Sequence, residues 1–450
     1  MTFQNRPFLL LSCLLWLGCA GASAQETGGD KNEEFNQARY QSTYNTQQHP
    51  AFAAAGSGPN SLGPGADRMF TFSLTGHWGH RFESGAEVYM NAELASGDPF
   101  TRNLVGLGGF TNGEITRAAG TTPKPYLQRL FWRQTWNQGG EREWLPSDFN
   151  QMARWVDKNR FVLTVGNFSV LDVFDDNAYA KDPRTQFMNW SHWTYGAYDY
   201  AADARGFGWG VAAEWFQDDW VYRLGRMSGP RTPNGLPVDF DLLRHYGDQF
   251  EVEHAHTLGG QPGKARVLAW RNRGVTASFA DARAYLLNNP GTDPQTILQV
   301  RNGERLKYGL GLNLEQALSD SVGVFLRTMK ADGRTETYAF TEIDASLSAG
   351  TLLHGRLWGR AQDRLGMAYM NNRLSNDRRR FLEAGGMSYF IGDGAGNFRY
   401  GAEHGSEVFY SVGLGKNLWV TGDWQHIANP AYNTLRGPVN VYAIRLHAEF

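Results

Sequence analysis

Apolar and polar residues alternate with a period of two along many segments of this chain. At residues 70–78 the even positions are Phe, Phe, Leu, Gly and Trp, whereas the odd positions are Thr, Ser, Thr and His. Residues 87–94 repeat the pattern, with Val, Met, Ala and Leu at the even positions. A period of two places successive side chains on opposite faces of a β-strand. Both segments are therefore predicted to be strands with one apolar face.

The last segment of the chain carries the strongest such signal. Tyr442, Ile444, Leu446, Ala448 and Phe450 occupy alternate positions, with His, Arg and Glu among the residues between them. A terminal Phe that closes such a strand resembles the C-terminal signature of bacterial outer-membrane proteins. Further alternating segments are 129–136, 207–215, 220–227, 308–316, 322–329, 408–414 and 418–427.

The connections between these segments alternate in length. Short ones fall at 81–85, 217–219, 258–263, 317–320 and 415–417, and long ones at 97–125, 170–206, 228–247, 274–304 and 428–438. Short turns on one side and long loops on the other are typical of outer-membrane barrels. If the short turns are periplasmic, both termini are periplasmic too. The connection 137–159 is long although it falls on the short-turn side, and the pattern does not explain it.

We therefore predict an all-β fold, a transmembrane antiparallel β-barrel of the outer-membrane porin type. Roughly 16 strands fit the pattern best, and about 18 are possible. The barrel is assigned to residues 68–450, after an N-terminal segment at 25–67 in which a first strand is expected near 38–46. Another strand is expected near 335–343. A barrel of this size encloses a water-filled lumen unless something fills it, and no plug domain or long helical plug pattern is present.

Composition supports a barrel over a helical membrane protein. Mean hydropathy is −0.48, and after the first residues no apolar run approaches the ~18 residues that a spanning helix needs. Aromatic residues nevertheless make up 14% of the chain, and there are 53 glycines. A strand that faces lipid on one side and water on the other is polar on average, as observed.

Residues 1–24 have the features of a cleavable secretory signal. Arg6 supplies the basic region, an apolar stretch follows at 8–17, and a small-residue site places cleavage between Ala24 and Gln25. The alternative is a lipoprotein site that acylates Cys19. Both cysteines, Cys13 and Cys19, lie within the signal. The exported chain would thus have neither a disulfide framework nor a thiol catalyst.

The charge of the exported chain is close to neutral. Without Arg6 there are 42 Lys and Arg against 45 Asp and Glu, a net charge of −3. The balance gives no basic excess for nucleic acid, so no nucleic-acid partner is expected. Charges of both signs are interspersed, which suits a pore lining that donates and accepts hydrogen bonds without rejecting neutral solutes.

A sugar-selective pore needs polar groups for hydroxyls, flat rings for CH faces, and weak binding. Strand parity predicts inward-facing candidates, each of which could equally be a solvated or ion-paired wall residue. The connection 170–206 adds acids, an amide, an arginine and aromatic rings. Among the connections it is our candidate for a loop that folds into the lumen and narrows the pore, and the alternative is an extracellular loop packed on its neighbours. The candidates are Glu87, Glu93, Arg129, Arg133, Arg223 and Arg327 on strands, and Asp175, Asp176, Asn177, Arg184, Trp190 and Trp193 in the loop.

Two constellations suggest metal binding only weakly. His254 and His256 share a strand face, but no third ligand is apparent. Asp175, Asp176 and Asp182 could approach calcium, yet the spacing of an EF-hand loop is absent. No metal and no cofactor is predicted.

Seven motifs stand in order along the chain: GGFTNGE at 108–114, LTVGNF at 163–168, FDDNAYAKDPRTQF at 174–187, YAFTE at 338–342, FIGDG at 390–394, NPAYN at 429–433 and RGPV at 436–439. Together they resemble the OprB-type carbohydrate-selective porin family. The resemblance implies a 16-stranded barrel in the bacterial outer membrane that admits small neutral sugars such as glucose passively to the periplasm. It is compatible with outer-membrane lipid and lipopolysaccharide as surroundings and with a homotrimer.

Three rival functions remain open at this point. A general non-selective porin would share every feature above. A polysaccharide export barrel would favour a lining of one charge sign, whereas the candidates here are mixed. A barrel enzyme needs a nucleophile and a base side by side, and no Gly-x-Ser-x-Gly motif is present. We predict a channel and no enzymatic activity.

Overall fold

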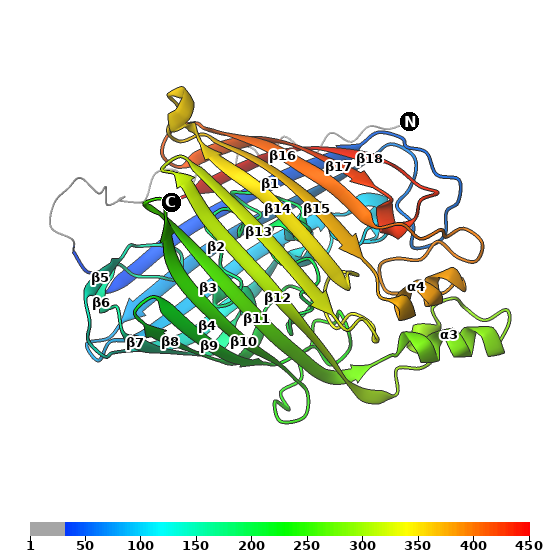
Figure 1. Cartoon of the computed structure of the whole chain (residues 1–450), viewed down its shortest axis with the longest axis horizontal. Helices are drawn as coiled ribbons and strands as arrows, with labels where there is room; N and C mark the ends of the chain where they lie inside the picture. The colour runs from blue at the N-terminus through cyan, green and yellow to red at the C-terminus, as the bar shows by residue number, and fades with distance from the viewer. Residues whose placement is uncertain (1–31) are drawn as a thin grey trace.

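The computed structural model describes residues 32–450. The predicted signal peptide and its cleavage site at Ala24 and Gln25 lie outside the described residues. Within them, 16 strands form one closed antiparallel barrel (Figure 1). Gln41 of β1 pairs with Thr75 of β2 on one side and with Glu449 of β18 on the other, which closes the ring. The predicted 16-stranded barrel is confirmed.

The barrel strands follow one another around the wall in chain order. The remaining two strands, β5 (Arg142–Leu145) and β6 (Arg154–Asp157), form a separate hairpin. The barrel strands are β1 (Asn36–His49), β2 (Asp67–Arg81), β3 (Ala86–Asp98), β4 (Lys124–Asn137), β7 (Arg160–Phe168), β8 (Gly208–Gln217), β9 (Trp220–Met227), β10 (Tyr246–Leu258), β11 (Gln261–Thr276), β12 (Gly303–Ser319), β13 (Val322–Ala331), β14 (Ala345–His354), β15 (Arg364–Arg373), β16 (Glu403–Gly413), β17 (Leu418–Ala428) and β18 (Val439–Glu449).

Two boundaries drawn from the sequence are wrong. The barrel does not begin at residue 68, because β1 in the N-terminal segment is a full member of the wall. The segment 335–343 is not a strand but part of the connection between β13 and β14. Its Phe340 has φ of +68° and is buried. A left-handed backbone at a bulky residue breaks a strand, so the alternation there was fortuitous.

The barrel wall buries polar side chains on its inner face and exposes apolar side chains on its outer face, the reverse of a soluble protein. Inward-facing Thr75, Glu93 and Arg327 are at most 1% exposed because other side chains fill the lumen around them. Outward-facing Leu224 and Ile444 are 59% and 55% exposed. This is the two-faced strand expected of a lipid-facing barrel. Among the described residues, no helix is long and apolar enough to cross a membrane.

Long connections gather at one end of the barrel, the loop end, and most short ones at the other, the turn end. The turn between β10 and β11 is only two residues, Gly259 and Gly260, both at positive φ, which glycine adopts without strain. At the loop end, α3 (Phe279–Asn288) lies beside α4 (Asn376–Glu383) (Figure 1), and the rings of Phe279 and Phe381 are 5.7 Å apart. The other short helices are α2 (Trp190–Trp193), η1 (Phe100–Arg102), η2 (Gly113–Arg117), η3 (Val170–Asp172), η4 (Thr296–Leu298), η5 (Gly355–Trp358) and η6 (Pro430–Tyr432).

Candidate functional site

The connection between β7 and β8, residues 169–207 and hereafter the lumen loop, lies inside the barrel. Its hydrogen bonds reach strands on both halves of the wall. The Met188 N–H donates to Glu407 on β16 (2.5 Å), and the Ala178 N–H donates to Glu315 on β12 (2.8 Å). Arg445 of β18 donates to the carbonyl of Pro183 (2.8 Å). The prediction that this connection folds into the lumen is confirmed by these contacts.

A capped turn directs the lumen loop inward as soon as β7 ends. The Ser169 hydroxyl accepts from the Leu171 N–H, and the Asp172 carboxylate accepts from the Ser169 N–H (2.9 Å). Arg129 of β4 then grips Asp172 with two hydrogen bonds of 2.7 Å each. Burial raises the pKa of Asp172, but Arg129 outweighs it and holds that pKa below its usual value. The predicted site residue Arg129 therefore positions the start of the loop.

A second anchor holds the loop to β12 and β13. Asp175 accepts from Arg327 Nε (2.8 Å) and from Asn313 Nδ2 (2.6 Å). Asn177 donates to Asn313 Oδ1 (2.7 Å) and accepts from the Tyr179 N–H (2.9 Å). Three predicted site residues, Asp175, Asn177 and Arg327, are thus brought together, but their polar atoms bind one another. In this arrangement they fasten the loop.

A third anchor joins the loop to β2 and β3. Arg184 donates to Glu93 Oε2 (2.6 Å), to Glu114 Oε2 (2.9 Å) and to Thr75 Oγ1 (3.1 Å). Burial lowers the pKa of Arg184, but Glu114 and Glu93 outweigh it and raise that pKa above its usual value. Glu93 also accepts from Gln128 (2.7 Å). The predicted residues Glu93 and Arg184 are in direct contact and are nearly fully buried.

The two predicted tryptophans belong to an aromatic cluster in the loop. Trp190 is 1% exposed, and its ring stacks on Phe340 with centroids 5.0 Å apart. Trp193 is 7% exposed and meets Trp190 edge to face at 4.8 Å. Tyr200 covers another side of the Trp190 ring. Both indole rings are therefore packed against neighbouring aromatic rings.

On the turn side of the lumen loop lies a cavity of about 260 Å³, hereafter the turn-side cavity. Four predicted site residues line it: Glu87, Arg133, Asp176 and Arg223. Sequence reasoning missed several of the others. Glu214 could have been found, because Val211, Ala213 and Trp215 beside it point outward. The remaining lining residues are Leu145, Gln151, Arg154, Arg160, Val162, Asp172, Val173, Lys181, Glu214 and Phe216.

Charged side chains of both signs line the turn-side cavity, and most of them form ion pairs. Lys181 contacts Asp176 at 2.6 Å and holds the pKa of that carboxyl well below its usual range. Arg223 contacts Glu214 at 2.9 Å. Arg133 differs from these residues, since no carboxylate of residues 32–450 lies within ion-pair distance of it. Its guanidinium donates to the Asn150 carbonyl at 3.0 Å and to Thr164 Oγ1 at 3.4 Å, and the remaining N–H groups can donate to a ligand.

The long connection at the turn end covers part of the barrel opening next to the turn-side cavity. Residues 138–159, hereafter the turn-end hairpin, carry β5 and β6 and cross beneath the lumen. Gln37 of β1 donates to the Asp148 carbonyl (2.9 Å), and the Met152 N–H donates to Tyr89 Oη of β3 (3.1 Å). The hairpin contributes Leu145, Gln151 and Arg154 to the cavity lining. This placement explains why a turn-side connection is so long.

The structure does not support either of the two residue groups considered as metal ligands. His254 and His256 lie on β10 with ring centroids 6.2 Å apart, and the Trp220 ring is 4.3 Å from His254. Throughout residues 32–450, no three side chains of His, Cys, Asp or Glu form a group that could hold a metal ion.

Solved structures share this fold. A structure titled "High pH structure of Pseudomonas putida OprB" superposes with a TM-score of 0.65 at 13% identity, covering 92% of this chain and 94% of that chain. The outer membrane channel DcaP of Acinetobacter baumannii gives a TM-score of 0.50 at 8% identity, covering 94% of this chain and 100% of that chain. At such identities the likeness demonstrates the barrel fold alone. No curated protein sequence matches the chain.

The sequence also matches a family model along almost its whole described length. That model is described as "Carbohydrate-selective porin, OprB family", and the match extends over residues 35–450. Fold and family are those of a channel. The chain belongs to the OprB family of carbohydrate-selective outer-membrane porins.

Proposed function

We propose that small neutral sugars diffuse passively through this outer-membrane porin by way of the turn-side cavity, where they bind weakly and briefly. The observation that carries the proposal is the mixed lining of that cavity, with cations and carboxylates facing one space of about 260 Å³. That volume is just below the ~300–1,000 Å³ of pockets for drug-sized ligands, which suits a sugar of one or two rings.

Arg133 is the side chain that we assign to sugar contact. Its guanidinium has no carboxylate partner in the described part of the chain, and a sugar hydroxyl can accept from it without breaking an ion pair. Glu87 and Asp176 supply acceptors on other sides of the cavity. A neutral solute can use both signs at once, whereas an anion or a cation meets repulsion from half of the lining. The lining therefore favours neutral polyols over ions of similar size.

The lumen loop sets the cross-section and the turn-end hairpin narrows the exit. With the short turns in the periplasm, a sugar passes the loop, dwells in the cavity and leaves beside the hairpin. Weak binding is required for flux, because tight binding would block release.

Osmotic swelling of liposomes tests the proposal. Swelling rates are measured with glucose, maltose, a neutral amino acid of glucose size, and gluconate. Sugars should enter faster than the size-matched amino acid, and Arg133→Ala should reduce that preference. Arg68→Ala, an exposed arginine at the loop end of β2, is the matched control and should leave the rates unchanged.

The outcomes separate the rival functions. Entry that depends on solute size alone indicates a general porin and contradicts sugar selectivity. Preserved preference in Arg133→Ala contradicts the assigned contact but not the channel. No entry of any solute contradicts the channel itself and favours the export barrel.

A further inference from the structure

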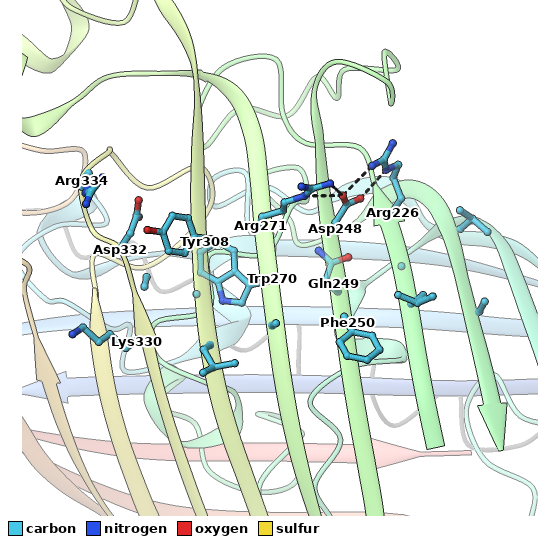
Figure 2. Close-up of a pocket in the computed structure, with 18 residues that line it drawn as sticks. Arg226, Asp248, Gln249, Phe250, Trp270, Arg271, Tyr308, Lys330, Asp332 and Arg334 are labelled. Carbon is cyan, nitrogen blue, oxygen red and sulfur yellow. Dashed lines mark hydrogen bonds and ion pairs between the residues drawn. The ribbon is translucent and has the colours of Figure 1, made fainter. Parts of the chain in front are cut away.

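A large hollow lies on the outer surface of the barrel, over β8 to β13. Its volume is about 1,060 Å³, far larger than the turn-side cavity. Figure 2 shows most of the charged residues in an upper row, with Phe250 and Lys330 below them. Leu224 and Leu310 are each 59% exposed at its floor, and Phe250 is 45% exposed. The hollow therefore opens outward, not into the lumen.

Strand register explains why the wall is concave here. One outward-facing row runs through Ala213, Leu224, Phe250, Ala269 and Leu310, each paired with the next across adjacent strands. Ala269 stands between the larger Phe250 and Leu310, so its small side chain leaves a furrow. The next row towards the turn end is apolar as well, with Val252, Val267 and Leu312 in register. The first row forms the apolar floor of the furrow, and the second continues the apolar wall below it.

The row towards the loop end is charged. Arg226, Asp248, Arg271 and Tyr308 are paired in sequence across β9 to β12. Asp248 accepts from Arg226 at 2.7 and 2.9 Å and also from Arg271 at 2.9 Å, as the dashed lines in Figure 2 show. Two guanidinium groups thus share one carboxylate and leave an excess of positive charge.

Further cations add to this excess. Lys330, which is in register with Leu310 of the apolar row, and Arg334 line the same hollow. Both are exposed, and neither lies within ion-pair distance of a carboxylate among residues 32–450. Asp332 is the second carboxylate of the lining. Above the row, Glu304 is shared between Arg273 at 2.7 Å and Arg244. In the lining of the hollow, four cations therefore stand against two carboxylates, Asp248 and Asp332, and they lie in the apolar row or on its loop side.

We propose that this furrow binds one phosphorylated glycolipid of the outer leaflet, the lipid A part of lipopolysaccharide. One acyl chain occupies the furrow at Ala269, and a headgroup phosphate accepts from Arg271, Lys330 and Arg334. Arg and Lys at the boundary between an apolar and a polar zone are suited to phosphate. The location agrees, because longer loops mark the outer side of such barrels and place the charged row at the outer headgroups. A second copy of the chain related by a twofold axis would instead present the same excess of positive charge to this face.

Native mass spectrometry of the purified full-length porin in detergent tests this assignment. Diphosphoryl lipid A is the probe, and phosphatidylethanolamine at equal concentration is the comparison lipid. We expect one lipid A to be retained and the comparison lipid to be lost at the same collision energy. Ala269→Trp fills the furrow and Lys330→Glu reverses a charge, and each should weaken retention at least tenfold.

Matched controls carry the same changes elsewhere on the outer wall. Ala349 is a small outward residue on β14 between Leu326 and Tyr369, so Ala349→Trp should keep the lipid. Arg373→Glu changes an exposed cation at the loop end of β15 and should also keep it. Folding of every variant is checked by heat-dependent migration in gels. Because Lys330→Glu leaves the apolar wall intact, it remains informative if Ala269→Trp fails to fold.

Three results would overturn the assignment. One is that Ala269→Trp and Lys330→Glu both retain lipid A as well as the unmodified porin does. Another is equal loss in the control variants, which would indicate non-specific adhesion. The third is a dimer or trimer of the chain that dissociates in Ala269→Trp, since the furrow would then be an interface between copies. Sugar entry in the swelling assay should be unchanged in all four variants, which keeps this test separate from the proposed sugar passage.

Discussion

Replacement of Arg184 by Met should release the middle of the lumen loop from the wall. The guanidinium makes two charge-assisted hydrogen bonds, to Glu93 at 2.6 Å and to Glu114 at 2.9 Å, and a third to Thr75 at 3.1 Å. Methionine replaces the unbranched apolar stem of the side chain without its guanidinium and so removes all three. Both carboxylates would then remain buried without this cation.

The energetic cost of the replacement depends on the contacts that Glu93 and Glu114 keep. Removing one partner of a buried ion pair costs about 3–5 kcal/mol. Glu114 keeps Arg117 at 2.8 Å and Glu93 keeps Gln128 at 2.7 Å, so the low end of that range, about 3 kcal/mol, applies. Since 1.4 kcal/mol is a tenfold change in an equilibrium, the detached state of this part of the loop should become roughly a hundredfold more populated.

Single-channel recording in planar bilayers measures the consequence. Arg184→Met should show higher mean conductance and frequent steps to a larger level, and should admit longer oligosaccharides in the swelling assay. Arg117→Met is the control, because it removes a single, partly exposed pair worth about 1 kcal/mol. Unchanged conductance and unchanged unfolding temperature in a correctly folded Arg184→Met protein would refute the reasoning.

Three further changes test other parts of the lumen. Burial, with Arg327 beside it, lowers the pKa of the His192 imidazole to about 3, so only the unfolded chain gains this proton below about pH 6.5. The free energy of unfolding should therefore fall as pH drops from 6.5 towards 3, and His192→Gln should flatten that slope in urea titrations; an equal slope would contradict it. A Cβ at Gly323 would lie 1.9 Å from the Tyr179 ring, so Gly323→Ala should cost about 1–3 kcal/mol in thermal unfolding, with relief when Tyr179→Ala is added. Trp190→Ala should cost about 3–5 kcal/mol through lost packing; loss of sugar entry at unchanged stability would instead favour direct stacking on sugar.

Alternation along single strands predicted the wall well. The outward and inward faces of β2 and β3 agree with the parity of residues 70–78 and 87–94, because a strand in a barrel has lipid on one side and lumen on the other. The same rule failed at 335–343, where polar residues bury themselves against lumen neighbours without forming a ladder. Thr337, for example, donates to the Thr341 carbonyl four residues away. Local alternation cannot separate these two situations.

The candidate site was predicted only in part. Parity correctly turned Glu87, Arg133 and Arg223 inward, and they line the turn-side cavity. It could not show that Glu93 and Arg327 are occupied by Arg184 and Asp175 of the lumen loop, since these contacts join residues about 90 and 150 positions apart. Nor could it place the turn-end hairpin across the mouth, because nothing in a single connection reveals which distant strands it will touch.

The sequence alone determined that each strand of the barrel wall has one apolar and one polar face. A period of two is a local property, and each strand carries it independently. The sequence also determined which residues point into the lumen. The tertiary structure decided which of those residues stay available to a solute. The lumen loop returns through the barrel and binds several inward charges with its own groups, among them Glu93, Arg129 and Arg327. Burial in so crowded a space requires such pairing. Arg133 remains open to the cavity because, after closure of the barrel, no carboxylate between residues 32 and 450 lies within ion-pair distance of it.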